Sequence, residues 1–203
     1  IDFLIANAGI LRDKSFKNMT NEMWDIVVDV HLRGTYLTVK AAYDQMIEQG
    51  HGGSIVVTSS TSGLIGNFGQ TNYGAAKAGI AGFARCLFQE GLKYGIRVNI
   101  LAPAAWSRLT EDIFPQGQGM EELLSPDKVS PIVAWLGSDD AKEVTGRTFL
   151  AQGNNVTLLS WQAHSLASKD NKEGPWDVEE LGKTVMAQYE KWPKGPQPTP
   201  REF

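Results

Sequence analysis

Short apolar runs alternate with long helical segments along most of this 203-residue chain. The runs are rich in β-branched residues, and the segments between them repeat apolar side chains every three or four positions, which indicates strands and helices. We predict strands at residues 1–5, 54–58, 97–101 and 148–151, and helices at residues 20–49, 73–94 and 126–137. This alternation predicts an α/β fold with a parallel sheet and right-handed crossovers.

Local signals mark where several of these elements begin. Thr20 and Ser125 are candidate N-caps, and Pro131 predicts either a kink in its helix or a later start. We predict a long loop with one helical turn at residues 104–125, and turn residues at 153–155. Asp177 and Glu180 form a capping-box-like start for a further helix whose apolar face continues to Trp192.

Polar residues follow the predicted strands. In a parallel sheet the carboxyl ends of neighbouring strands meet at one edge, and functional groups gather there. Those ends fall at Asn7, at Ser59-Ser60 and at Pro103. We therefore expect a functional site at this edge of the sheet.

Tyr73, Lys77 and Ser60 form a constellation that can carry acid–base chemistry. Tyr73 and Lys77 lie four positions apart at the start of a predicted helix, so their side chains share one face. A phenol has a pKa of about 10, and a nearby ammonium group lowers it by favouring the phenolate. Ser60 can hold a substrate carbonyl oxygen beside the phenol. Taken alone, Tyr73 and Lys77 also fit an interfacial tyrosine and a lysine that reaches solvent.

The stretch from Ser60 to Lys77 resembles the active-site signature of the short-chain dehydrogenase/reductases. Ala6-Asn7-Ala8-Gly9 is similar to that family's Asn-Asn-Ala-Gly motif with its first Asn replaced, and Pro103-Ala104 stands where the family usually has Pro-Gly. The resemblance covers roughly residues 1–155, with the motifs in the expected order. It implies a Rossmann-type doubly wound parallel sheet and NAD or NADP as the cofactor.

Residues 30–34, 66–70 and 102–110 narrow this resemblance. They are similar to the (3R)-hydroxyacyl-CoA dehydrogenase part of the peroxisomal multifunctional enzymes of type 2 and to bacterial relatives, although β-ketoacyl carrier-protein reductases share much of the pattern. By this resemblance we expect an NAD(P)-dependent oxidoreductase that interconverts a 3-hydroxyacyl and a 3-oxoacyl thioester. A steroid or another secondary alcohol is the alternative substrate.

The resemblance also implies roles for the residues nearest the chemistry. Tyr73 would be the acid and base, Ser60 would orient the substrate oxygen, and Lys77 would hold the nicotinamide ribose hydroxyls and lower the Tyr73 pKa. Many family members have Asn at the position of His31, where it supports a proton-relay water. We expect His31 to be a catalytic residue at this position, where its imidazole can hold water or a backbone carbonyl. The alternative is a packed or capping histidine.

The remaining expected site residues flank the cofactor. The resemblance places Asn7, Ala8 and Gly9 in the wall on the cofactor side. Pro103 and Ala104 would flank the nicotinamide, with Ser107 as a candidate for its carboxamide. The hydride comes from the cofactor, so the protein supplies placement and electrostatics.

The family's phosphate-binding segment, Thr-Gly-x-x-x-Gly-x-Gly, does not occur in this sequence, and Ile1–Ile5 corresponds to the family's fourth strand. We therefore expect the C-terminal part of the fold with the first three strands absent, and an unpaired apolar edge at residues 1–5. Residues 1–160 would form a partial catalytic domain, and residues 161–203 an extension with one helix and a Pro-rich arm. A non-catalytic fragment is the competing hypothesis.

Composition limits the class of protein. The chain has 19 basic and 23 acidic residues, which argues against a nucleic-acid partner. No apolar run reaches the roughly 18 residues of a membrane span. The single Cys86, which we expect to be buried, excludes internal disulfides and Cys-rich metal sites. We expect the protein to be cytoplasmic, since Arg201-Glu202-Phe203 is not a peroxisomal signal. We also expect it to bind a small-molecule substrate and to form a homo-oligomer when complete.

Overall fold

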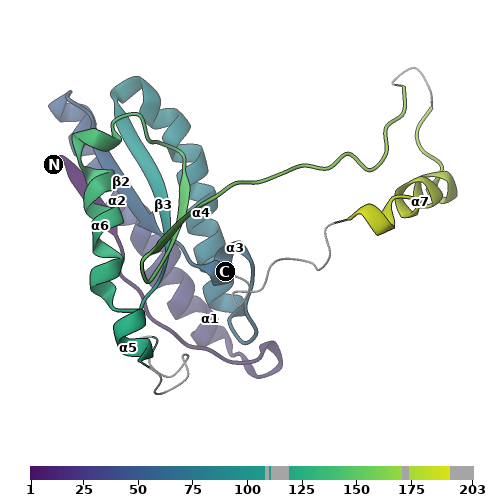
Figure 1. The fold of residues 1–203 in the computed structure, drawn as a ribbon, viewed down its shortest axis with the longest axis horizontal. Coiled ribbons are helices and arrows are strands. Elements are labelled where there is room, and N and C mark those ends of the chain that lie inside the picture. Colours follow the sequence, from purple (N-terminus) through teal and green to yellow (C-terminus); the bar gives the residue numbers. More distant parts are fainter. Residues whose placement is uncertain (108–109, 111–118, 171–173, 193–203) are drawn as a thin grey trace. The chain divides into compact units, whose positions relative to one another are not determined.

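The structure is a computed structural model (Figure 1), which describes residues 1–107, 110, 119–170 and 174–192. The chain forms two compact units, Ile1–Leu159 and Ser160–Phe203, and each is described by itself. The first unit holds one sheet, helices α1 to α6 and every candidate site residue named above. Its organisation determines where those residues lie.

One five-stranded sheet with the order β1-β2-β3-β4-β5 forms the centre of the first unit. Its strands are β1 (Phe3–Ala6), β2 (Gly53–Thr58), β3 (Ile96–Ala104), β4 (Thr148–Gln152) and β5 (Asn155–Leu159). The first four run parallel, and β5 returns antiparallel to β4. The parallel strands confirm the predicted α/β class, and they bring the carboxyl ends of β1, β2 and β3 to one edge.

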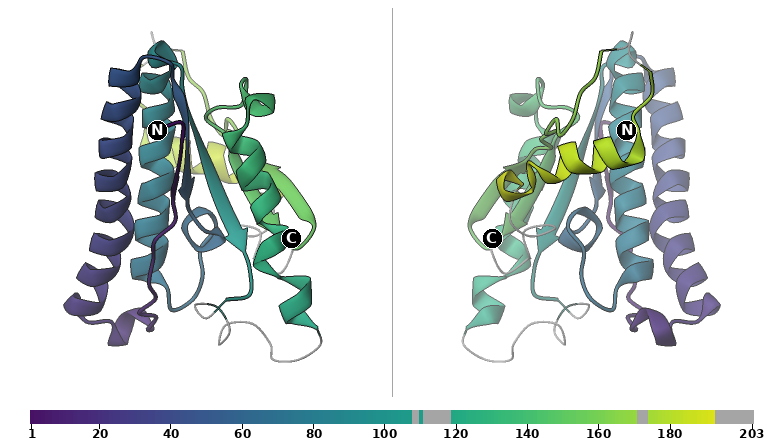
Figure 2. Two further views of the ribbon diagram at one scale, coloured as in Figure 1. Left: turned by 90° about the vertical axis from the view of Figure 1, so that its left-hand side faces the viewer. Right: turned by 90° about the vertical axis from the view of Figure 1, so that its right-hand side faces the viewer.

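Helices cover both faces of this sheet. Figure 2 shows α2 (Gly34–Gln49) and α4 (Thr71–Gly91) on one face and α6 (Ser130–Gly137) on the other. Along β2, Ile55 and Val57 belong to the core on the α2 and α4 side, whereas Val56 belongs to the core on the α6 side. A strand covered on both faces needs consecutive apolar residues, which explains the unbroken run that predicted it.

The first long helical segment contains an irregular turn. α1 (Asn21–Val28) starts after Thr20, whose side-chain oxygen accepts a hydrogen bond from Met23 N, as the N-cap prediction requires. A π-helical segment, Asp29–Arg33, then connects α1 to α2. Each hydrogen bond of a π-helix spans five residues instead of the four of an α-helix, and such segments are frequent at functional sites. Apolar periodicity does not reveal them. This one contains His31.

Two element boundaries differ from the prediction. β3 continues to Ala104, so Pro103 lies within the strand, opposite Ala151, rather than closing it. α6 starts at Ser130 with Pro131 in its first turn, where a missing N–H removes no helical hydrogen bond, so the later start is correct. Ser125 makes no side-chain cap hydrogen bond.

Three short elements lie in segments that we predicted as loops or turns. α3 (Thr61–Leu64) follows β2, and α5 (Met120–Leu123) is the one helical turn predicted within residues 104–125. β5 was not predicted, because only the turn at residues 153–155 was recognised. Its residues are mostly exposed and pair only with β4, so the strand carries little of the apolar pattern of a buried one.

The second unit contains α7 (Val178–Met186). The Asp177 side chain accepts hydrogen bonds from Glu179 N and Glu180 N, which confirms the predicted start. The helix ends earlier than predicted, and a 3-10 turn at Tyr189–Lys191 follows. The Pro-rich arm that begins at Pro193 lies outside the described residues.

Cys86 is exposed, so the prediction of a buried thiol is wrong. α4 buries Ala76, Ile80 and Ala84 against the sheet. Cys86 follows Ala84 by two positions, about half a turn, and therefore faces the other way. Its side chain lines a groove between α2 and α4 together with Tyr36.

Candidate functional site

Ser60 lies directly after β2 and begins the short helix α3. Its backbone is extended, with φ −161° and ψ 156°, and its Oγ accepts a hydrogen bond from Ser62 N at 3.2 Å. The buried Ser59 donates its Oγ hydrogen to Lys77 O at 2.8 Å. These bonds connect the end of β2 to the first turns of α4, which carry Tyr73 and Lys77.

Tyr73 and Lys77 come together with Ser60 at this strand end. Lys77 is only 3% exposed, and its Nζ donates a hydrogen bond to Thr58 O at 2.7 Å. The same Nζ lies 5.6 Å from the centroid of the Tyr73 ring. The Ser60 side chain is close enough to Tyr73 to lower the pKa of its phenol. The three residues singled out by their spacing therefore form one cluster at the carboxyl edge of the sheet.

Burial dominates the pKa values in this cluster. Burial raises the pKa of Tyr73 above its ordinary 10.0, and the Asp13 carboxylate raises it further, whereas the hydrogen bond with Ser60 lowers it. Burial also lowers the pKa of Lys77 from 10.5 to about 8. The prediction of a depressed Tyr73 pKa is thus wrong for this structure, because desolvation of the phenolate outweighs its favourable contacts.

Gly63 allows α3 to approach α4 closely. A Cβ at this position would lie 2.6 Å from the Lys77 carbonyl carbon, from Lys77 Cβ and from Ala78 N. No side chain fits there without displacing one helix, because two of these atoms belong to the α4 backbone. Gly63 therefore keeps Ser60 at its observed distance from Tyr73 and Lys77. The sequence patterns did not predict this contact.

Asn7 lies at the end of β1, beside the end of β2. Its Oδ1 accepts a hydrogen bond from Thr58 Oγ1 at 2.9 Å, and Thr58 is the residue whose carbonyl oxygen binds Lys77. Asn7 and Ala8 are exposed, and Gly9 is half-buried. Two hydrogen bonds through Thr58 thus connect Asn7 to Lys77. The sequence reasoning did not identify Thr58 as the residue between them.

The other expected cofactor-flanking residues lie at the end of β3. Pro103 and Ala104 are half-buried and pair with Ala151 and Gln152 of β4. Ser107 is exposed beyond the strand, and its backbone N–H donates to Thr110 Oγ1 at 2.9 Å. β3 neighbours β2, so these residues share the edge that carries Ser60.

His31 is 1% exposed and contacts two parts of the site. Its Nε2 lies 2.7 Å from Ile10 O and 3.1 Å from Ile10 N. Its ring meets the Tyr73 ring edge-on, with centroids 5.1 Å apart. Burial lowers the pKa of His31 from 6.5 to about 4. His31 is thus a packed histidine whose Nε2 contacts the Ile10 backbone, and its part in a proton relay stays a prediction.

A polar network that the sequence reasoning missed surrounds Tyr73. The Gln70 amide donates to Asp13 Oδ2 at 2.6 Å and accepts from Ser62 Oγ at 2.6 Å. The fully buried Asn72 donates to Arg12 O and to Met23 O, both at 3.0 Å, and its Oδ1 accepts from Tyr73 N at 2.7 Å. The bonds to Asp13, Arg12 and Met23 join positions 49 to 60 residues apart, which no local motif predicts.

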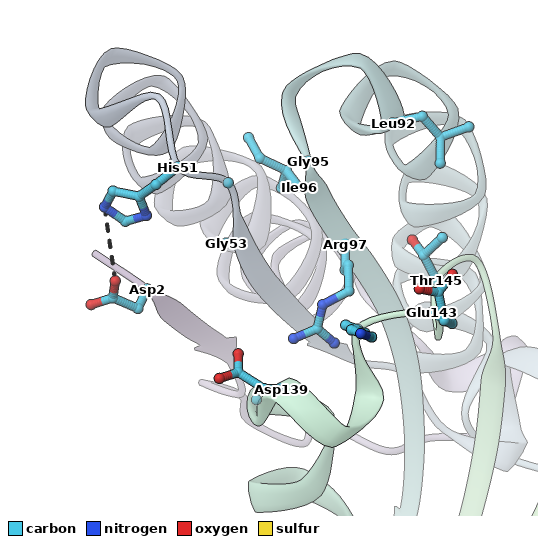
Figure 3. Close-up of a pocket in the computed structure, with 13 residues that line it drawn as sticks. Asp2, His51, Gly53, Leu92, Gly95, Ile96, Arg97, Asp139, Glu143 and Thr145 are labelled. Atoms are coloured by element: carbon cyan, nitrogen blue, oxygen red, sulfur yellow. Dashed lines mark ion pairs between the residues drawn. The ribbon is translucent and has the colours of Figure 1, made fainter.

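A separate cavity of about 480 Å³ lies at the opposite edge, where strands begin (Figure 3). Its lining includes Asp2, His51, Arg97 and Asp139. Arg97 donates to the carbonyl oxygens of Leu136, Ser138 and Ala141, so it satisfies the C-terminal end of α6. None of the candidate site residues lines this cavity, and we do not assign the chemistry to it.

Comparisons with known proteins place this site in a family. A family model of short chain dehydrogenases matches residues 1–112. The chain belongs to the short-chain dehydrogenase family. A solved short chain dehydrogenase from Mycobacterium avium superimposes with a TM-score of 0.80 and 38% identity, over 97% of this chain and 67% of that one. Short-chain dehydrogenases are oxidoreductases that use NAD or NADP.

Two curated short-chain dehydrogenase relatives are informative. Peroxisomal multifunctional enzyme type 2 of Mus musculus is 44% identical over 162 residues, which are 80% of this chain and 22% of that protein. A hydroxyacyl-CoA dehydrogenase of Mycobacterium tuberculosis is 38% identical over 197 residues, which are 91% of this chain and 62% of that protein. The chain thus spans between about a fifth and three fifths of these relatives, and the predicted subgroup resemblance is confirmed.

The donors at the edge suit a short-chain dehydrogenase cofactor. An ammonium group has three N–H donors, and Lys77 uses one of them on Thr58 O. The two remaining donors belong to a nitrogen 5.6 Å from the centroid of the Tyr73 ring, and such donors suit hydroxyl oxygens. Among the described residues, no group of acidic, His or Cys side chains could hold a metal ion. No helix in the described parts is long and apolar enough to cross a membrane.

Proposed function

We propose that this chain carries the Ser60-Tyr73-Lys77 site of an NAD(P)-dependent oxidoreductase that interconverts a 3-hydroxyacyl and a 3-oxoacyl thioester. The carrying observation is that Tyr73 has both Ser60 and the buried Lys77 as neighbours, with Lys77 Nζ 5.6 Å from the centroid of its ring. This arrangement offers two hydroxyl groups to one substrate oxygen atom. A cation beside them compensates the charge that proton transfer leaves on the phenol.

Reduction uses the protonated phenol. The pKa of Tyr73 is raised, so the hydroxyl carries its proton at neutral pH. Ser60 donates a hydrogen bond that holds the carbonyl oxygen, and Tyr73 gives its proton to the same oxygen, which becomes the alcohol. A nicotinamide held at this edge would supply the hydride that reduces the carbonyl carbon. In the oxidative direction the phenolate takes the alcohol proton, so oxidation is favoured at higher pH.

The remaining residues support binding. We propose that Lys77 holds the nicotinamide ribose hydroxyls, that Asn7, Ala8 and Gly9 form the cofactor-side wall, and that Pro103, Ala104 and Ser107 flank the nicotinamide. Support comes from their shared edge and from the Asn7–Thr58–Lys77 hydrogen bonds.

The substrate class rests on relatives. One is named a hydroxyacyl-CoA dehydrogenase, and the mouse enzyme belongs to the multifunctional group that we identified from residues 30–34 and 66–70. A steroid or other secondary alcohol is the second candidate. The specificity constants of the complete gene product for a 3-hydroxyacyl-CoA and for a secondary steroid alcohol decide between them, and a higher value for the steroid overturns our assignment.

The acid–base role is tested with Tyr73→Phe in the complete gene product. Loss of the proton donor should lower turnover about 10²–10⁴-fold while the calorimetric affinity for the cofactor stays unchanged. Tyr94→Phe is the matched control, because Tyr94 lies beyond the other end of α4 and should keep normal turnover. Turnover in Tyr73→Phe similar to that of Tyr94→Phe contradicts the mechanism.

A non-catalytic role is the competing hypothesis for the 203-residue chain itself. Its support is that the family's glycine-rich phosphate segment does not occur in this sequence. Calorimetry of this polypeptide with NAD and with NADP separates the two hypotheses. Micromolar binding supports a functional cofactor site, and no binding at millimolar cofactor supports the non-catalytic fragment.

For assembly and compartment we propose a cytoplasmic homo-oligomer. α2 and α4 form a groove of about 340 Å³ in which the Tyr36 ring meets the Phe83 ring edge-on. Such a partly apolar surface suits the binding of a second copy of the chain.

The exposed thiol of Cys86 suits a reducing compartment. Analytical ultracentrifugation and fluorescence imaging of the complete product test these points. The alternative compartment is the peroxisome, which the names of several relatives specify.

A further inference from the structure

Two segments next to Tyr73 are bonded to each other. Residues 7–20 lie between β1 and α1, and residues 59–70 lie between β2 and α4. Lys14 N donates to Gly69 O at 2.9 Å, and the Gln70 amide donates to the Asp13 carboxylate at 2.6 Å. Gly69 and Gln70 precede Tyr73 by only four and three positions. Residues 12–18 and 66–70 therefore form one surface beside the phenol, which we call the loop surface.

Phe68 lies on a closed turn of the loop surface, and its side chain is 91% exposed. Gln70 N donates to Asn67 O at 3.4 Å, and Asn67 Nδ2 donates to Gln70 Oε1 at 3.0 Å, so two bonds close the turn. Gly69, with φ 80°, supplies the left-handed conformation that such a turn needs at its third position. The turn thus holds a large ring in solvent, where it contributes almost nothing to packing. This position favours a binding role for the ring.

The loop surface is positively charged. Residues 12–18 include three basic side chains, those of Arg12, Lys14 and Lys17, and one acidic side chain, that of Asp13. All three basic residues are exposed. The Asp13 carboxylate accepts the bond from Gln70, and residues 66–70 carry no charge. An anionic ligand that reaches this surface therefore meets an excess of cations.

An exposed ring beside cations suits the nucleotide end of a coenzyme A thioester. Nucleobases stack on aromatic side chains, and phosphate groups bind Lys and Arg side chains. Coenzyme A carries its acyl group at one end of a flexible pantetheine chain and an adenine nucleotide with three phosphate groups at the other. A steroid alcohol has neither a base nor a phosphate, so it gives the ring and the cations of this surface nothing to bind.

The loop surface is within reach of the reacting end of such a substrate. Phe68 precedes Tyr73 by five residues, so their Cα atoms are at most about 18 Å apart even for a fully extended chain. Lys14 is bonded to Gly69, the residue after Phe68. The pantetheine chain is long and flexible enough to join a thioester at Tyr73 to a base at Phe68.

We propose that the loop surface binds the adenine and the phosphate groups of a coenzyme A thioester, with Phe68 as the stacking ring and Lys14 as a phosphate ligand. This inference rests on the proposed function and extends it from the reacting carbonyl to the group that carries the acyl chain. An acyl carrier protein is the other carrier of such thioesters. One ring on a tight turn suits a single base better than it suits the surface of a protein.

A truncated substrate separates the nucleotide from the reacting end. The complete gene product is assayed with one 3-hydroxyacyl group on coenzyme A and on N-acetylcysteamine, which has no nucleotide. The ratio of kcat/KM for the first substrate to kcat/KM for the second should fall about 10-fold in Phe68→Ala, because one stacked base is lost. It should fall about 5-fold in Lys14→Ala at low salt and less at high salt, because salt screens an exposed ion pair.

Matched controls come from exposed side chains at the opposite edge of the sheet. Leu92→Ala removes an apolar side chain that is 60% exposed, and Lys142→Ala removes an exposed cation. Both should keep the parent ratio. If Phe68→Ala and Lys14→Ala also keep it, the proposal is overturned. A larger loss in Phe68→Ala for an acyl carrier protein thioester than for the coenzyme A thioester assigns the surface to the carrier protein and overturns it too.

Calorimetry with free coenzyme A tests the surface without turnover. The complete product is first saturated with NAD or NADP, so that coenzyme A does not occupy the cofactor site. The Kd for coenzyme A should rise about 10-fold in Phe68→Ala relative to Leu92→Ala. Equal Kd values in the two variants contradict the proposal.

The two measurements separate this proposal from the proposed function. A product that binds coenzyme A through Phe68 but turns over neither thioester supports the loop surface and contradicts the proposed function. A product that turns over both thioesters with the same ratio in the parent and in Phe68→Ala supports the proposed function and overturns the loop surface. Because Phe68 is 91% exposed, Phe68→Ala should keep the parent's urea midpoint, so that a change in the ratio reports binding.

Discussion

Replacement of Gly63 by alanine perturbs a close contact between α3, which Ser60 begins, and α4. The added Cβ would lie 2.6 Å from the Lys77 carbonyl carbon and from Ala78 N, which belong to a helix backbone and cannot turn aside. α3 must therefore move away from α4. Because Ser60 begins α3 and Tyr73 is on α4, the two hydroxyl groups that share the substrate oxygen separate.

The magnitude follows from two opposing effects. Overpacking of a close contact lowers the free energy of unfolding by about 1–3 kcal/mol. For Gly63→Ala we expect a cost near the upper end of this range, because the new Cβ would meet backbone atoms. A helical Gly→Ala change stabilises by about 0.5–1 kcal/mol, which offsets part of this cost. We expect a net loss of about 2 kcal/mol, or about 1 M in urea midpoint for an m-value of about 2 kcal/mol/M. A displacement of about 1 Å should also lower kcat about 10²-fold.

Urea unfolding and steady-state turnover of the complete product measure both effects. Gly82→Ala is the matched control, since Gly82 is also helical but its new Cβ would meet only Arg85 Nη2, at 4.0 Å. That variant should gain about 0.5–1 kcal/mol and keep its turnover. If Gly63→Ala is as stable and as active as Gly82→Ala, the close approach of α3 does not position Ser60 and our reasoning fails.

Three further predictions concern buried polar groups. In the protein without cofactor, ultraviolet difference titration should show Tyr73 ionising above 10.0, because burial raises its pKa; ionisation near neutrality would refute the dominance of desolvation. The pKa of His31 is about 4 in the folded state and near 6.5 in the unfolded state, so the unfolded state binds the proton more tightly. The contribution of His31 to the free energy of unfolding is therefore present in full above pH 6.5 and is lost as the pH falls toward 4. Urea unfolding should show a loss of up to about 3 kcal/mol between these pH values that is absent in His31→Gln, and parallel pH curves would contradict it. Asn72→Ala removes three hydrogen bonds to the backbone and should cost about 2–4 kcal/mol, whereas exposed Asn155→Ala should stay within about 0.5 kcal/mol. Similar urea midpoints for the two Asn variants would refute this.

The elements that were predicted correctly are those whose burial leaves a local pattern. β2 is covered on both faces and is therefore apolar at consecutive positions, and α4 repeats its buried residues at helical spacing. β5 is exposed and has no such pattern, so only its turn was recognised. Cys86 was misplaced because α4 also carries apolar residues on the side that faces its groove with α2.

Ser60, Tyr73 and Lys77 were recognisable because Ser60 directly follows β2 and the other two lie four positions apart in the first turns of α4. Strand order alone brings such positions to one edge, so their spacing carries the signal. The residues that the sequence reasoning missed act over long separations. The Gln70–Asp13 and Asn72–Arg12 bonds each join positions about 60 residues apart, and a backbone acceptor has no residue-type signature.

The order of apolar runs and helical segments, by itself, determined the parallel sheet, the edge that carries the site and the three residues that meet there. These follow from periodicity and chain direction, which are local properties. Only the tertiary structure decided that the Tyr73 pKa is raised and that His31 is neutral and bound to Ile10. Protonation depends on desolvation and on the nearest charges, and both are set by segments that come together only when the chain has folded.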